Sequence, residues 1–291
     1  MICVIDSCKN SAKDEDHELC PTHLNIWIAN PSVLPSTIRI QNSTKYTNLV
    51  EIPKGSPSFL EVEKKFMKDW VKPNANGVRI EAIYNIYLHP EIVQNYKNYR
   101  AQVEDRGKYK AKGLYEGNEM ILYHGTDHLC SIIFDTDKQS LLCKGTNCGG
   151  CGILMNGFDM AKEKPKIYPL QVGQNNQGRS FQRLGQGLYF TPYSSKAHYY
   201  GHGGQKVCPN DSSRTCRIMF MSKIVVGNPW QPHCVSQDAR GPPEGFDSTW
   251  GKKGNCPHGS SVLVYEEYAI YRHDACLPVR YIAYSYTSTV E

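Results

Sequence analysis

Hydrophobic and polar residues alternate along this chain with two different spacings. In residues 59–71 the apolar positions recur every three or four residues, so Phe59 and Phe66 would share one face of a helix. Lysines gather toward the end of that stretch, as the C-terminal end of a helix prefers. The same spacing follows Pro90 through residues 91–104, and a proline suits the first turn of a helix. We therefore predict two amphipathic helices in the first half of the chain.

Alternation with a period of two, which is typical of strands, begins at residues 78–88 and dominates the second half of the chain. Further predicted strands occupy residues 37–40, 120–126, 153–159, 187–192, 216–227, 260–271 and 279–287. The predicted fold class is therefore α+β, with β-sheet as its larger part.

Composition divides the chain into three parts. Residues 1–30 form a cysteine-bearing head, and the polar residues 31–55, with Pro31 and Pro35, are typical of a linker. Residues 56–291 carry most of the predicted elements and are long enough for one large domain.

The charge balance indicates a mildly basic protein. Lys and Arg number 33 against 28 Asp and Glu, giving a net charge of +5, and the pI is near 8.5. Dedicated nucleic-acid-binding domains are usually more basic. No stretch approaches the ~18 apolar residues of a membrane span, and the first residues lack the pattern of a secretory signal. We expect a nuclear or cytoplasmic protein without a membrane partner.

The head carries four residues with the spacing of zinc ligands, in a chain with 12 cysteines. Cys3, Cys8, Cys20 and His23 give two pairs of N/S ligands separated by a short loop, as a tetrahedral zinc site requires. The alternative is a tail with incidental cysteines. If it binds zinc, we expect the head to bind nucleic acid or protein, or simply to cap the fold.

A second cysteine group lies in a Gly-rich stretch that is predicted as a loop. Cys143, Cys148 and Cys151 would form half of a metal site with a distant partner such as Cys130, or merely line the loop.

Three further segments bear residues suited to chemistry on a nucleotide. His124 follows an apolar strand and precedes Gly125, so its imidazole could donate to a ribose hydroxyl while the glycine admits a ligand close to the backbone. Tyr189, Tyr199 and Tyr200 could sandwich a flat ring such as nicotinamide. A single histidine or tyrosine of this kind is more often a structural residue, so each segment alone is a weak signal.

The segment YEEYAIY places two glutamates on opposite faces of one strand. Glu267 shares a face with Tyr265 and Ala269, whereas Glu266 faces the other way. A carboxylate within an apolar strand is costly unless it is partnered or functional. We expect one of the two to be solvated and the other to face inward.

Eight segments, in their order along the chain, are EVEKKFMKDW, ILYHGT, CGILMNGFD, GQGLYF, SSKAHYY, IVVGNP, PPEGFDS and EEYAIYRHDACLPVRYIAY. Together they resemble the catalytic domain of poly(ADP-ribose) polymerases, including tankyrases and small fungal members. The resemblance covers roughly residues 56–291. It implies the ADP-ribosyltransferase fold, with mixed or antiparallel β-sheets and flanking helices, and NAD as co-substrate.

The resemblance also assigns roles. His124, Tyr189 and Glu267 match the catalytic triad, in which the histidine holds the adenosine ribose of NAD and the glutamate, the one directly before Tyr-Ala-Ile-Tyr, is catalytic. A carboxylate near the ribose would stabilise the oxocarbenium character that develops as the bond to nicotinamide breaks. The glutamate that faces inward is then Glu267, and Glu266 is its outward neighbour.

Four further residues match positions that bind NAD in the family. Gly125 would hold the nicotinamide carboxamide through its backbone, Tyr200 would stack on the nicotinamide, and Thr126 and Lys196 would be additional contacts. The family often has a serine where this chain has Ala197, so one hydrogen bond to the carboxamide, a net ~0.5–1.5 kcal/mol, would be missing.

Tankyrases carry a zinc-binding insertion at the position of Cys208 and Cys216, but Asp211 and Met219 stand where two of its ligands are expected. We therefore expect Cys208 and Cys216 to form a disulfide or to stay as two thiols.

The function implied is transfer of ADP-ribose from NAD to a macromolecular acceptor, protein or nucleic acid, with release of nicotinamide. The stretch between IVVGNP and PPEGFDS is short, which favours mono-ADP-ribosylation or short chains. Two alternatives stay open: hydrolysis of NAD without a macromolecular acceptor, and a catalytically silent module that binds ADP-ribose or nucleic acid.

Overall fold

A computed structural model describes residues 37–41, 46–129, 148–162, 167–168, 179–180, 182–200, 206–208, 211–232, 238–255 and 262–289. The predicted zinc ligands of the head, and Cys130 and Cys143, lie outside these residues, so those predictions stay predictions.

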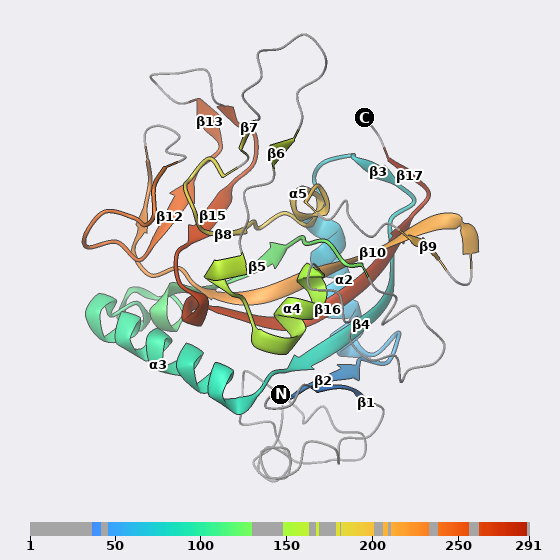
Figure 1. Cartoon of the computed structure of the whole chain (residues 1–291), viewed down its shortest axis with the longest axis horizontal. Coiled ribbons are helices and arrows are strands. Elements are labelled where there is room, and N and C mark those ends of the chain that lie inside the picture. Colours follow the sequence, from blue (N-terminus) through green and yellow to red (C-terminus); the bar gives the residue numbers. More distant parts are fainter. Residues whose placement is uncertain are drawn as a thin grey trace.

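A seven-stranded antiparallel sheet forms the centre of the molecule (Figure 1). Its strands follow the order β1-β2-β4-β16-β10-β5, and β9 also pairs with β10. Their bounds are β1 Thr37–Gln41, β2 Tyr46–Glu51, β4 Arg79–Tyr87, β5 Glu119–His124, β9 Lys206–Cys208, β10 Asp211–Val225 and β16 Cys276–Tyr286.

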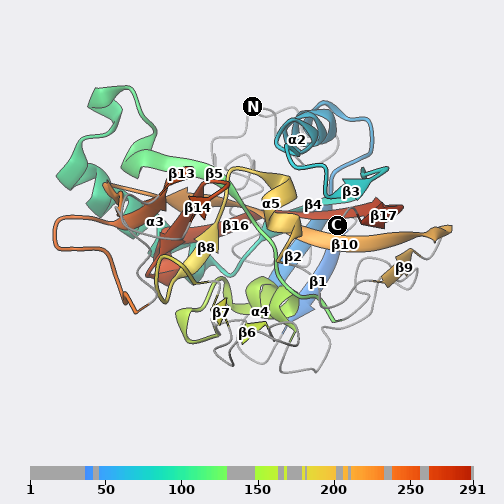
Figure 2. The same cartoon turned by 90° about the horizontal axis from the view of Figure 1, so that it is seen from above.

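Alternation along the central strands gives the sheet two buried faces. In β10, Ile218 and Phe220 belong to one apolar cluster, whereas Met219 and Met221 belong to the other. Helix α2, Pro57–Lys68, covers the second cluster, while α3, Pro90–Gly107, and α4, Gly149–Asn156, pack into the first. Figure 2 shows α2 and α4 on opposite sides of the sheet.

A smaller mixed sheet has the order β11-β12-β15-β8, with bounds β8 Leu188–Phe190, β11 Pro229–Trp230, β12 Ser248–Gly251 and β15 Glu267–Ile270. The two-stranded pairs are β3 Ala75–Asn76 with β17 Ser288–Thr289, β6 Ile167–Tyr168 with β7 Arg179–Ser180, and β13 Gly254–Asn255 with β14 Val262–Leu263. The short helix α5 spans Ser194–His198, and 3-10 turns occupy Lys110–Lys112, Glu116–Asn118, Met160–Lys162 and His273–Ala275.

The predicted helices form for the reasons that the sequence suggests. Helix α2 begins at Pro57, and the hydroxyl of Ser56 caps it by accepting the N–H of Phe59 at 3.3 Å. Helix α3 begins at Pro90 and ends before Lys108, whose left-handed conformation stops the helix. The α+β class is confirmed. Within the described residues, every helix is too short or too polar to cross a membrane.

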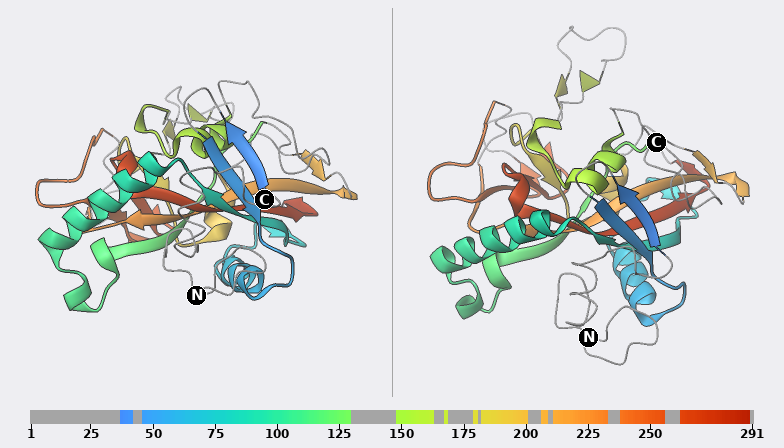
Figure 3. Two further views of the ribbon diagram at one scale, coloured as in Figure 1. Left: turned by 90° about the horizontal axis from the view of Figure 1, so that it is seen from below. Right: turned by 60° about the horizontal axis from the view of Figure 1, so that its bottom comes forward.

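One sequence prediction is wrong and two are only partly right. The stretch predicted as a linker contains the strand predicted at residues 37–40, as β1, but it also contains β2, and the two strands extend the sheet through β4 and lie beside α4 (Figure 3). The strand predicted at residues 153–159 is wrong, because residues 153–156 belong to helix α4. Residues 153–155 are three consecutive buried apolar residues, and so short an apolar run does not distinguish a strand from a buried helix. The stretch 260–271 is divided between β14 and β15.

Candidate active site

The three triad candidates lie on neighbouring strands of the two sheets. His124 ends β5, Tyr189 lies in the middle of β8, and Glu267 begins β15. Strand β8 pairs with β15, and an antiparallel bridge between Tyr123 and Thr191 joins β5 to the chain just beyond β8, with N···O distances of 2.8 and 3.1 Å. The candidate site therefore occupies the seam between the two sheets (Figure 1).

His124 is 8% exposed and is held in a defined orientation. Its Nδ1 lies 2.9 Å from the carbonyl oxygen of Tyr189, and its ring lies against Phe158 and Phe190, with centroids 5.1 and 5.4 Å away. A carbonyl only accepts, so Nδ1 carries the proton, and Nε2 of the neutral ring is an acceptor. The neutral imidazole would therefore accept from a ribose hydroxyl, and donation to the ribose as well would require the imidazolium.

The hydroxyl of Tyr189 fixes a turn. It accepts the N–H of Leu184 at 2.8 Å and donates to the carbonyl of Gly185 at 2.7 Å. Gly185 has a φ of +95°, a conformation that favours glycine. The tyrosine thus supplies its carbonyl to His124 and its side chain to the turn that precedes β8.

Glu267 is a buried carboxylate whose two oxygens have different surroundings. Its Oε1 accepts the hydroxyl of Tyr200 at 2.8 Å and lies 2.6 Å from Nζ of Lys196. Its Oε2 is buried and has no hydrogen-bond partner among the described residues. Such a buried acceptor is costly, and a ligand hydroxyl would satisfy it.

The ionisation of Tyr200 depends on its contact with Glu267. Burial first, and then the charge and hydrogen bond of Glu267, raise the pKa of Tyr200 far above its ordinary value. Tyr200 therefore stays a hydrogen-bond donor at any physiological pH. The ammonium of Lys196 also lies 5.1 Å from the Tyr200 ring centroid, which gives a compact cluster of cation, ring and carboxylate.

The burial of the two neighbouring glutamates differs as predicted. Glu267 is 3% exposed, whereas Glu266 is only partly buried. The expectation that one glutamate faces inward and the other reaches solvent is confirmed in this coarse sense, with Glu267 as the inward one.

Gly125 approaches the backbone of α5 so closely that no side chain fits. A Cβ at this position would lie 1.9 Å from the carbonyl oxygen of Ala197. This contact joins the segment after His124 to the helix that carries Lys196. Ala197 itself is buried and offers no hydroxyl at the position where the family often has a serine.

Two serines of the segment SSKAHYY, for which the sequence predicted no role of their own, anchor α5. Ser194 donates to the carbonyl of Phe66 in α2 at 2.7 Å, and the hydroxyl of Ser195 accepts the N–H of Lys72 at 3.0 Å. Both serines are fully buried. Adjacent small hydroxyls in the first turn of a buried helix were the available signal, because a buried hydroxyl needs a nearby partner.

Of the other predicted NAD contacts, Thr126 turns toward a different element. A Cβ on Gly149 of α4 would lie 2.2 Å from its hydroxyl oxygen, so Thr126 packs against the start of α4. Lys196, another predicted contact, forms an ion pair with the carboxylate of Glu267.

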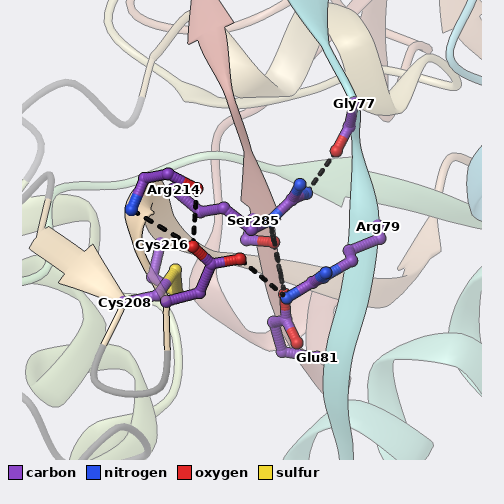
Figure 4. The surroundings of a disulfide bond; sticks show 9 residues. Gly77, Arg79, Glu81, Cys208, Arg214, Cys216 and Ser285 are labelled. Carbon is purple, nitrogen blue, oxygen red and sulfur yellow. Dashed lines mark hydrogen bonds and ion pairs between the residues drawn. A yellow bond between two sulfur atoms is a disulfide. The ribbon is translucent and has the colours of Figure 1, made fainter.

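Cys208 and Cys216 form a disulfide between β9 and β10, which decides between the two states expected for them (Figure 4). Beside it lies a polar cluster in which Glu81 accepts from Arg79 at 2.7 Å and from the Ser285 hydroxyl. The disulfide closes the outer end of the long strand β10, far along the chain from Glu267.

The seam thus gathers an oriented imidazole, a buried carboxylate with one committed oxygen, a cation and two tyrosines. Of these groups, the carboxylate can stabilise a nearby positive charge, and the imidazole and the carboxylate can each accept a hydroxyl. A search of the sequence against models of known protein families finds no match.

Proposed function

We propose that this chain transfers ADP-ribose from NAD to a macromolecular acceptor and releases nicotinamide. The observation that carries the proposal is the carboxylate of Glu267, buried in the seam with Oε2 lacking a hydrogen-bond partner among the described residues. A sugar hydroxyl bound there would complete its hydrogen bonding.

The surroundings of Glu267 suit the breaking of a bond between ribose and a neutral leaving group. Positive charge would develop on the ribose, and the carboxylate, fixed at Oε1 by Lys196 and Tyr200, would stabilise it through Oε2. Because its position is fixed before the reaction, little reorganisation is needed as the charge develops.

The other side of the site would bind the rest of NAD. His124, with Nδ1 directed at the Tyr189 carbonyl, presents Nε2 to a ribose hydroxyl. The backbone of Gly125 would hold the carboxamide, and the rings of Tyr189 and Tyr200 would flank the nicotinamide.

The acceptor is proposed to be a protein or nucleic acid, modified with single units or short chains. Cys3, Cys8, Cys20 and His23 stay a predicted zinc site in a head that would recruit the acceptor. A nuclear or cytoplasmic location also stays a prediction.

The test compares two neighbouring glutamates with the same substitution. Nicotinamide release from NAD is measured for the wild type, Glu267→Gln and Glu266→Gln. We expect Glu267→Gln to lower the rate by about 10²- to 10³-fold, as loss of one preorganised electrostatic group does. Glu266→Gln should stay within about twofold, because Glu266 is partly solvated. NAD affinity of Glu267→Gln, measured by titration, should change much less than the rate.

Acceptors are screened with NAD labelled in its adenylate half, offered with protein, DNA and RNA. Label on an acceptor supports transfer. Nicotinamide release without label on any acceptor would identify an NAD hydrolase instead. Absence of release with every acceptor would leave a silent binding module and overturn the proposal.

A further inference from the structure

A histidine and two cysteines that have no part in the candidate active site form a buried cluster. The ligand atoms of His128, Cys148 and Cys151 all lie within 4.8 Å of one another, and the three residues are buried. In the sequence, Cys148 and Cys151 formed only part of a possible half site, and His128 had no assigned role.

We propose that His128, Cys148 and Cys151 bind a zinc ion that fixes α4 to the segment following His124. Zinc bonds of about 2.3 Å to sulfur and 2.0–2.1 Å to nitrogen put the ligand atoms of a tetrahedral ion roughly 3.5–3.8 Å apart. Distances within the cluster would have to shorten by about 1.3 Å at most to reach that geometry. Thiolate with imidazole is a donor set that zinc prefers among the common divalent ions.

The imidazole is oriented as a metal ligand requires. Nε2 of His128 lies 2.7 Å from the hydroxyl of Tyr281, a residue buried in β16. Histidines that bind metals characteristically hydrogen-bond through the second ring nitrogen, which fixes the ring and the tautomer. With Nε2 bonded to Tyr281, Nδ1 would be the nitrogen that binds the metal.

The cysteines occupy the start of α4, where thiolates are favoured. Cys148 precedes the helix and Cys151 lies in its first turn, at the positive end of the helix dipole. The Sγ of Cys148 also accepts the N–H of Leu129 at 3.3 Å. These surroundings stabilise sulfur as an anion, the form that binds zinc.

Glycine at position 150 allows the histidine to reach the cysteines. A Cβ on Gly150 would lie 2.3 Å from Cδ2 of His128, and the Gly150 N–H donates to the carbonyl of Asp127 at 3.1 Å. The start of α4 and the segment 126–129 are therefore already in backbone contact. On binding, Zn²⁺ would replace the protons of the two thiols to form a zinc dithiolate. The two protons would go to solvent, and no oxidation state would change.

The experiment measures zinc in the full chain, purified under reducing conditions from zinc-supplemented cells. Metal content per chain is determined by elemental analysis and native mass spectrometry for the wild type, Cys151→Ser and Cys276→Ser. Cys276 is a buried cysteine outside the cluster and is the matched control. We expect Cys151→Ser to contain one zinc fewer per chain than the wild type, and Cys276→Ser to match the wild type. Because the comparison is a difference, zinc bound by the head does not affect it.

A second measurement uses the wild type alone, in case Cys151→Ser does not fold. Native protein is alkylated with and without a zinc chelator, and the labelled peptides are mapped by mass. Cys148 and Cys151 should be protected until the chelator is added, whereas Cys276 should be equally protected in both samples. Equal zinc in the wild type and Cys151→Ser, chelator-independent labelling, or a disulfide between Cys148 and Cys151 would each overturn the proposal.

Discussion

Gly125→Ala tests whether the segment after His124 is held against α5. The added Cβ would lie 1.9 Å from the carbonyl oxygen of Ala197, whereas a carbon and a carbonyl oxygen normally approach to about 3.3 Å. One side must therefore move by about 1.4 Å. His124 is tied to Tyr189 on one side, and Ser194 is tied to Phe66 on the other, so neither side moves without losing contacts.

We expect Gly125→Ala to lower the free energy of unfolding by about 1–3 kcal/mol, the usual cost of overpacking a well-packed region. Gly152→Ala is the control with the same chemical change. Gly152 lies in α4, where an added Cβ would meet no atom of another described element within 4 Å. Alanine in a helix is favoured over glycine by about 0.5–1 kcal/mol. The two variants should therefore shift stability in opposite directions.

The assay is urea unfolding followed by tryptophan fluorescence, with thermal unfolding as a second probe. Each kcal/mol should move the Tm by about 2–4 °C for a domain of this size. Nicotinamide release should also fall in Gly125→Ala, because the contact joins the segment after His124 to the helix that carries Lys196. If Gly125→Ala were as stable as the wild type, or gained as much as Gly152→Ala, the close contact would not exist in solution.

Two further predictions concern the site and the sheet. Tyr200→Phe keeps the ring but removes the hydrogen bond to Glu267, and a hydrogen bond to a charged group contributes about 1.5–3 kcal/mol. The kcat for nicotinamide release should therefore fall by up to about 10- to 150-fold, while the KM for NAD changes less. An unchanged kcat would show that this hydrogen bond does not position the carboxylate. Burial raises the pKa of Glu81, but hydrogen bonds from Ser285 and Arg79 outweigh burial and hold the pKa below its ordinary value. The stability that Glu81 contributes is therefore present above about pH 4.3 and is lost as the pH falls below it, so Glu81→Gln should show a shallower loss of stability in acid unfolding, and parallel curves would refute the assignment.

The helices and strands that the sequence predicted correctly are those whose apolar residues recur with a clear period. The period-two pattern of residues 78–88 became β4, and the helical spacing after Pro90 became α3. In the candidate site, alternation predicted only that one of the two glutamates faces inward, and the family resemblance selected Glu267. All four residues of β15 are buried, so the pleat alone could not have made that choice.

The missed parts depend on contacts between distant segments. Thr47 and Asn48 are polar yet fully buried in β2, so the composition of the supposed linker gave no sign that it pairs with β4. The role of Ser194 depends on a carbonyl 128 residues earlier in the chain. The tautomer of His124 is likewise set by the carbonyl of Tyr189, and main-chain acceptors leave no mark on the sequence.

The bridge between Tyr123 and Thr191 has a consequence for how this protein can vary. Both of its hydrogen bonds use main-chain atoms, so the spacing of His124 from β8 is independent of which side chains stand at these two positions. Only proline removes a main-chain donor. Both positions are buried and their side chains bond to Asp69 and to the Glu266 carbonyl, so ordinary substitutions there would act through packing and leave the main-chain bridge in place. A proline at either position would instead remove one hydrogen bond of the seam while leaving every reactive group in the chain.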